Sequence, residues 1–125
     1  MKILTITLIA FLFFHTTSHA QSLSGPQKNA VRSAKQYLSF QAFSRDGLIH
    51  QLSSRAGDGY DIFDATVAVD SLKVDWNEQA AIAAIRYLEF MPFSCQGLKQ
   101  QLSSRAGEKF TAVQADYGAQ KSGAC

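Results

Sequence analysis

The residues that most often take part in catalysis or metal binding are few in this sequence of 125 residues. His50 is the only histidine after residue 20, and we interpret it as a solvated side chain on a helix face rather than a catalytic base or metal ligand. Cys95 and Cys125 have no histidines at a zinc-binding spacing. Ser53 and Ser103, each the first of a serine pair, have no nearby histidine and aspartate pattern of a nucleophilic triad. The sequence therefore predicts a protein that is not an enzyme and that uses no metal or cofactor.

An acidic stretch is the one hint of a cation site. Asp58, Asp61 and Asp64 surround two glycines, as the ligands of a calcium loop do. An EF-hand needs a fixed ligand spacing that ends in a glutamate, and both are missing here. A glycine-rich loop that would hold a phosphate is missing from the sequence as well. We therefore expect neither a calcium site nor a nucleotide site.

Residues 1–20 have the pattern of a secretory signal peptide. Lys2 precedes an apolar run that ends at Phe14, and Ser18 and Ala20 form a small-x-small cleavage signal. The run of about a dozen apolar residues is shorter than the roughly 20 that are needed to span a bilayer. We expect cleavage after Ala20 and a soluble product in the periplasm, without a stable membrane anchor.

The charge balance argues against a nucleic-acid partner. Beyond residue 20 the chain has 11 basic and 10 acidic side chains, so its net charge is +1. A nucleic-acid-binding domain usually carries a strong basic patch. We therefore expect no binding to nucleic acid, although the helices predicted below have a helix-turn-helix-like arrangement.

The strongest signal is an internal repeat with a period of 50 residues. Residues 26–75, aligned without a gap on residues 76–125, share 17 identical positions. The heptapeptide Gln-Leu-Ser-Ser-Arg-Ala-Gly occurs in both copies, at 51–57 and 101–107. Identity at this level indicates a duplication, so the two halves should share one fold. We divide the exported chain into repeat 1, residues 21–75, and repeat 2, residues 76–125.

Each repeat is predicted to form three short helices. In repeat 1, Ala30, Ala34, Tyr37 and Leu38 have the i, i+4, i+7, i+8 spacing of a helix face, and repeat 2 has the same residue types 50 positions later. Short polar residues at the expected helix starts are good N-caps, and a glycine after the second helix suits a left-handed stop. The predicted fold class is all-α, with two tandem three-helix, helix-turn-helix-like repeats of about 50 residues. The predicted boundary residues are Gly25, Pro26 and Asp75 at the first helices, Ser44, Ser94, Gly57 and Gly107 at the second, and Asp61 and Thr111 at the third.

Large aromatic side chains are predicted to fill the core. A three-helix unit of about 50 residues buries little surface by itself, so it needs its largest apolar side chains inside. Trp76 lies where the repeats meet, and we favour packing against both repeats over a role in binding a partner. The aromatic residues predicted as core are Tyr37, Phe40, Phe43, Tyr60, Phe63, Tyr87, Phe90, Phe93 and Phe110.

The two cysteines are predicted to form one disulfide, because an even pair in an exported chain is usually bridged. In the repeat alignment Cys95 corresponds to Arg45, and Cys125 corresponds to Asp75. We therefore expect an ion pair between Arg45 and Asp75 to join the same two elements in repeat 1. Pairing of Cys125 with a second molecule is the alternative.

The repeat motif resembles that of a known family. The pattern Ala-x-x-Tyr-Leu-x-Phe-x-x-Phe-Ser-x-x-Gly-Leu-x-x-Gln-Leu spans Ala34–Leu52 and again Ala84–Leu102, with Asp-Trp-Asn-Glu-Gln-Ala at Asp75–Ala80. It is similar to the Ltp family, which are host cell-surface lipoproteins of prophages built from tandem helix-turn-helix-like repeats. The resemblance implies superinfection exclusion, in which the protein protects a lysogen by stopping the DNA of an incoming phage. It also implies that the partner is the phage tape-measure protein or the channel that it helps to form.

The sequence differs from the family pattern in having no lipobox cysteine. With the predicted signal peptide and disulfide, this favours a periplasmic, monomeric form that blocks DNA injection by binding the tape-measure protein or an inner-membrane injection factor. The alternative is a periplasmic binding or inhibitor module that acts on a host envelope protein. Arg55 and Arg105 recur in the repeated heptapeptide, but arginines near a helix end also bond to its last carbonyls. The candidate partner-binding residues are Asp46, His50, Arg55, Gln96, Lys99 and Arg105.

Overall fold

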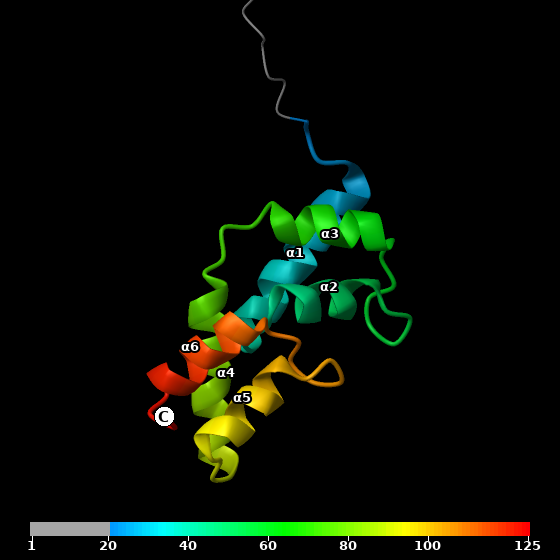
Figure 1. The fold of residues 1–125 in the computed structure, drawn as a ribbon. Coiled ribbons are helices and arrows are strands. Elements are labelled where there is room, and N and C mark those ends of the chain that lie inside the picture. The colour runs from blue at the N-terminus through cyan, green and yellow to red at the C-terminus, as the bar shows by residue number, and fades with distance from the viewer. Residues whose placement is uncertain (1–20) are drawn as a thin grey trace, which may run out of the picture.

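The computed structural model describes residues 21–125, which form six α-helices and no strand. The expected signal peptide, residues 1–20, lies outside the described residues. Among the residues described, no helix is both long and apolar enough to cross a membrane. The all-α fold class is confirmed, with three helices in each repeat (Figure 1). The helices are α1 (Gly25–Phe40), α2 (Arg45–Ser53), α3 (Ile62–Asp70), α4 (Trp76–Phe90), α5 (Cys95–Ser103) and α6 (Ala112–Lys121).

Polar N-caps define the helix starts. Ser44 and Ser94 cap α2 and α5 as predicted, because each hydroxyl accepts a hydrogen bond from the backbone N–H three residues later. Asp61 and Thr111 cap α3 and α6, and Thr111 forms a complete capping box. At α1 the prediction was one residue late, since Ser24 is the cap that accepts a hydrogen bond.

The prediction that Gly57 and Gly107 end the second helices in a left-handed conformation was wrong. The helices α2 and α5 end four residues earlier, and the chain continues into a turn in which the backbone bonds back to Ser54 or Ser104. The left-handed residue comes later in this turn, at Gly59 with φ 69° and at Lys109 with φ 59°. The backbone reverses direction at these two residues, because the N–H of Gly59 bonds to the carbonyl of Ser54 and the N–H of Lys109 bonds to the carbonyl of Ser104.

Each repeat has its own core of small and branched aliphatic side chains. Leu48 and Leu52 are fully buried in repeat 1, and Leu98 and Leu102 take the same places in repeat 2. The first helix of each triplet packs closely on the third, because alanines form the contact face. The tyrosine of each first helix meets a phenylalanine edge-to-face, with ring centroids 5.8 Å apart in both repeats.

Three aromatic residues that were predicted as core are exposed instead. Phe40, Phe63 and Phe90 keep 68%, 67% and 85% of their surface in solvent. Phe40 and Phe90 are the last residues of α1 and α4, where the chain already leaves the packed face. Phe63 lies two residues before the buried Ala65, which is about 200° around a helix and therefore on the opposite side. The three rings therefore lie outside the core, where alanines line the contacts between helices.

The junction between the repeats is an exchange of short segments rather than a helix–helix interface. Ala42 of repeat 1 belongs to the core of repeat 2, while Trp76 of repeat 2 packs against the core of repeat 1. Trp76 was predicted to pack against both repeats, and its packing on the core of repeat 1 is the part that the structure shows. Hydrogen bonds reinforce it, because Gln79 Oε1 accepts from the N–H of Phe43 at 3.1 Å. The two triplets are thus held together through segments of each that reach the other (Figure 1).

The start of the second helix is tied to the end of the third by different means in the two repeats. In repeat 2 a disulfide joins Cys95 to Cys125, with their Cα atoms 4.8 Å apart. In repeat 1 the guanidinium of Arg45 donates to both carboxylate oxygens of Asp70, from Nε at 2.7 Å and from Nη2 at 2.8 Å. The predicted partner, Asp75, was wrong because its carboxylate caps α4, accepting the N–H of Glu78 at 3.0 Å. The two linkages are therefore equivalent in the helices that they join, but not in the residue positions that form them.

Stability at low pH should report on this ion pair. The hydrogen bonds from Arg45 lower the pKa of Asp70 below its ordinary value. A carboxylate with a lowered folded-state pKa contributes stability above its unfolded pKa of about 3.9, and the contribution is lost as the pH falls through the folded value. Because the pair is exposed, Asp70→Asn is expected to lower the free energy of unfolding by less than about 1 kcal/mol at neutral pH.

A double-mutant cycle with Arg45→Gln, measured by urea unfolding, isolates this coupling. The coupling energy should be present at pH 7 and should disappear in acid. A coupling that is unchanged below the pKa of Asp70 would contradict the assignment.

Candidate functional site between the repeats

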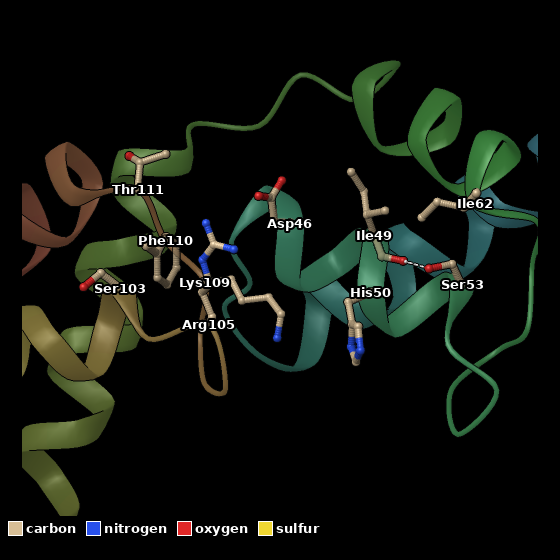
Figure 2. A pocket seen from close by; sticks show the side chains of 10 residues that line it. All are labelled: Asp46, Ile49, His50, Ser53, Ile62, Ser103, Arg105, Lys109, Phe110 and Thr111. Carbon is tan, nitrogen blue, oxygen red and sulfur yellow. Dashed lines mark hydrogen bonds between the residues drawn. The ribbon is translucent and has the colours of Figure 1, made fainter.

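A cleft of about 540 Å³ lies where α2 of repeat 1 faces the loop between α5 and α6 of repeat 2. Figure 2 shows its two walls, one formed by α2 with the start of α3 and the other by the segment from Ser103 to Thr111. No single repeat contains both walls, so the cleft exists only because the repeats are packed together. The residues that line it are Asp46, Ile49, His50, Ser53, Ile62, Ser103, Arg105, Lys109, Phe110 and Thr111.

Apolar side chains form part of each wall. Ile49 and Phe110 are buried, and Ile62, the first residue of α3, is 59% exposed. Lys99 is the repeat-2 counterpart of Ile49, so this apolar position is specific to repeat 1. The exposed part of this surface is available for an apolar side chain of a partner.

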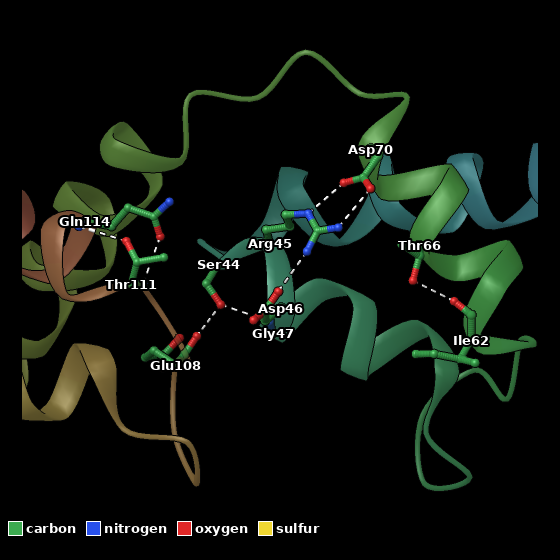
Figure 3. A network of polar contacts seen from close by, with 10 residues as sticks. All are labelled: Ser44, Arg45, Asp46, Gly47, Ile62, Thr66, Asp70, Glu108, Thr111 and Gln114. Atoms are coloured by element: carbon green, nitrogen blue, oxygen red, sulfur yellow. Dashed lines mark hydrogen bonds and ion pairs between the residues drawn. The ribbon is translucent and has the colours of Figure 1, made fainter.

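A buried serine fixes one wall of the cleft against the other. Ser44 caps α2 by accepting the N–H of Gly47 at 2.9 Å, and its hydroxyl also donates to the backbone carbonyl of Glu108 (Figure 3). Only 1% of its surface is exposed, whereas its counterpart Ser94 is exposed. The contact pins the repeat 2 loop to the start of α2, and the Thr111 capping box fixes the end of the same loop at α6. The cleft is therefore preformed.

The charges in the cleft are unbalanced toward positive. Asp46 is already paired, because its carboxylate accepts from Arg45 Nη1 at 3.0 Å. Arg105 and Lys109 form no ion pair with any residue in 21–125. Both side chains extend from the loop toward α2 (Figure 2). Two unpaired cations beside apolar surface are suited to holding an anionic group of a partner.

The two serine hydroxyls that line the cleft already have hydrogen-bond partners. Ser53 donates its hydroxyl to the carbonyl of Ile49 at 2.8 Å, and Ser103 donates to that of Lys99 at 2.9 Å. These bonds within each helix hold both hydroxyls. In the described part of the chain, no group of three or more histidine, cysteine, aspartate or glutamate side chains is placed to hold a metal ion. With apolar surface and two cations, the cleft is suited to binding a partner.

The chain is similar to a known protein family and to a solved structure. The sequence model of the Ltp family, described as host cell surface-exposed lipoproteins, matches the chain twice, over residues 26–72 and 75–121. The chain belongs to the Ltp family. A solved structure of Ltp, a superinfection exclusion protein from the Streptococcus thermophilus temperate phage TP-J34, is 32% identical and superimposes with a TM-score of 0.70. The match covers 79% of this chain and 97% of that one. No curated protein sequence matches.

Three of the six candidate partner-binding residues line the cleft of this Ltp-family protein. Asp46 and His50 come from α2, and Arg105 comes from the loop after α5. The other three lie elsewhere: Arg55 and Gln96 are exposed outside the cleft, and Lys99 forms an ion pair with Asp116.

Sequence reasoning missed Ile49, Lys109 and Phe110. For Lys109 a signal existed, because the alignment of the Ltp repeats places it opposite Gly59. A glycine replaced by a long cationic side chain in a turn is a place to look for function. Ile49 and Phe110 gave no such signal, because each is also a normal core residue.

A second polar arrangement is common to both Ltp repeats. Tyr37 donates its hydroxyl to Asp58 at 2.5 Å, and Tyr87 donates to Glu108 at 2.7 Å. In each repeat a glutamine of the repeated heptapeptide donates to the tyrosine hydroxyl at 3.2 Å. The hydrogen bond to Asp58 raises the pKa of Tyr37. The pKa of Tyr87 is raised mainly by burial and secondly by the hydrogen bond to Glu108. These bonds hold the turn after the second helix against the first helix.

Proposed function

We propose that this protein is a prophage-encoded superinfection exclusion protein, which acts in the periplasm and blocks the injection of DNA by an incoming phage. The observation that supports this most strongly is the likeness to the exclusion protein of phage TP-J34, which extends over 97% of that chain at 32% identity. Both repeats contribute to the match, so it concerns the whole double-repeat fold rather than one helical motif.

Two features support action outside the cytoplasm. Residues 1–20 have the pattern of a signal peptide, which we propose is cleaved after Ala20. The Cys95–Cys125 disulfide suits an oxidising compartment, because cytosolic thiols are kept reduced.

The proposed mechanism is binding rather than catalysis. The protein would occupy a surface on the tape-measure protein, or on an inner-membrane injection factor, and so prevent passage of the phage genome. The cleft between the repeats is the proposed contact site, because it is preformed and combines apolar surface with two cations that have no ion pair within residues 21–125. A rigid site loses little conformational freedom on binding, which favours affinity.

A phage challenge tests the proposal. The full chain is produced in a Gram-negative host, which is then exposed to a panel of tailed phages while plaque formation, adsorption and delivery of phage DNA are measured. We expect normal adsorption and strongly reduced DNA delivery for at least one phage. The matched control is the same chain without residues 1–20, which should stay in the cytoplasm and give no protection.

Normal DNA delivery by every phage tested would contradict the proposal. Escape mutants of an excluded phage identify the partner, and mutations in the tape-measure gene would support that protein as the target. If protection is absent and affinity capture from uninfected cells yields one dominant envelope protein, the chain is instead a module that acts on the host.

A further inference from the structure

Lys109 has an unfavourable backbone conformation at a position where the other repeat has glycine. Its φ is 59°, and among residues 21–125 it is the only residue other than glycine with a positive φ. The equivalent residue of repeat 1 is Gly59, with φ 69°. A residue with a β-carbon is strained in this region, and lysine lacks the short polar side chain that makes asparagine tolerable there. The turn itself therefore favours glycine at both positions, and repeat 2 has a lysine in spite of it.

The surroundings of Lys109 supply a reason for this strain. Lys109 and Arg105 line the cleft, whereas their repeat-1 counterparts, Gly59 and Arg55, do not. The carboxylate nearest in sequence, Glu108, accepts the hydroxyl of Tyr87 at 2.7 Å and forms no ion pair with either cation. Strain that persists where a functional group is needed is a common property of binding sites.

We propose that the cleft binds an acidic segment of a partner protein. A carboxylate of that segment lies between Arg105 and Lys109, and a neighbouring apolar side chain packs against the exposed Ile62. Charge complementarity supports this occupant, because both cations lack a partner within the described chain while the acidic residue of the cleft, Asp46, is already paired. Hydrogen bonds between charged groups are the strong ones in such a contact.

The apolar walls favour a polypeptide over a nucleic acid. A nucleic-acid groove needs cations that follow a phosphate backbone, whereas this cleft places two cations beside isoleucine and phenylalanine side chains. The biological role of this contact rests on the proposed function above. The binding itself does not depend on a phage, so it is tested separately.

The test compares two short peptides, acetyl-Leu-Glu-Glu-Leu-amide and its neutral counterpart acetyl-Leu-Gln-Gln-Leu-amide. Each is titrated into the disulfide-bonded chain of residues 21–125, and binding is followed by NMR of the backbone amides. We expect shifts confined to residues 46–53, 62 and 103–111, and an affinity for the acidic peptide that is about ten-fold higher. Equal affinities, or shifts outside the cleft, would overturn the proposal. A single-stranded oligonucleotide that binds the same amides more tightly would also overturn it.

Substitutions of Arg105 and Lys109 test whether these two cations cause the preference for the acidic peptide. Arg105→Gln and Lys109→Gly should each remove most of the preference for the acidic peptide, and Lys109→Arg should retain it. Arg55→Gln, the same substitution in repeat 1, should leave binding unchanged. Loss of the preference in Arg55→Gln would contradict the assignment to the cleft.

A melting experiment separates function from folding. Because Lys109→Gly relieves the left-handed strain, its Tm is expected to rise by about 3 °C even though it binds less well. A variant that binds less well because it is partly unfolded would melt at a lower temperature. A lower Tm for Lys109→Gly would show that the fold needs the lysine, and the argument from strain would fail.

Discussion

Replacing both cysteines, as Cys95→Ser with Cys125→Ser, is expected to lower the free energy of unfolding by about 3–4 kcal/mol. The bridge closes a loop in which the cysteines are separated by 30 residues, and this loop contains all of α5 and α6. A closed loop of this length restricts the unfolded chain, which is the main source of the stabilisation in the chain-entropy account. Small domains have a total stability of roughly 5–15 kcal/mol, so the loss would be a large fraction of it.

Urea unfolding of the oxidised wild type and of the double variant measures this effect. Reduced wild type is a second comparison and should behave as the double variant does. The matched control is Arg45→Gln, which breaks the corresponding exposed linkage in repeat 1 and should cost less than about 1 kcal/mol. Equal stability of the oxidised wild type and the double variant would show that other contacts already hold the end of α6 in place.

The second large effect is expected at Gly57, where Gly57→Ala should destabilise the protein by about 3 kcal/mol, the upper end of the range for overpacking. A β-carbon built at this residue would lie 1.9 Å from the backbone oxygen of Gln51. That oxygen belongs to α2 and also accepts the N–H of Asp58 at 3.1 Å, so it cannot move without distorting the helix end and the turn. The clash can be relieved only by opening the turn that follows α2.

Gly107→Ala is the matched control, because it makes the same change in the same heptapeptide. There the nearest atom to an added β-carbon is the amide nitrogen of the Gln101 side chain at 3.3 Å, and the backbone oxygen lies at 3.5 Å. We expect a change within about 1 kcal/mol, since alanine also restricts the unfolded chain. Thermal and urea unfolding of the two variants test this contrast, and equal destabilisation would contradict the difference between the two turns.

Much of the fold could be predicted from the sequence. Ser44, Ser94, Asp61 and Thr111 begin their helices as predicted, because capping depends on a side chain and a backbone N–H within three residues of it. The duplication also revealed that the two halves share one fold. It correctly indicated that the start of the second helix is joined to the end of the third, although the acidic partner of Arg45 is Asp70.

The candidate site could be predicted only in part. Asp46, His50 and Arg105 were selected as exposed or repeated polar residues, and all three line the cleft. Nothing in the local sequence distinguishes Arg105 from Arg55, which stand in identical heptapeptides. They differ because the loop that follows Arg105 is held against α2 by the bond from Ser44 to Glu108, whereas Ser94, the counterpart of Ser44 in repeat 2, is exposed.

The sequence alone determined that the chain is a tandem of two helical triplets with a disulfide in the second, since helix periodicity, caps and duplication are properties of neighbouring residues or of a simple alignment. Only the tertiary structure decided which aromatic residues are buried, which acid pairs with Arg45, and that a cleft with two cations opens between the repeats. These features depend on side chains brought together from distant parts of the chain, and on how closely alanine-lined helices approach. A period of 50 residues carries no information about the way in which one copy packs against the other.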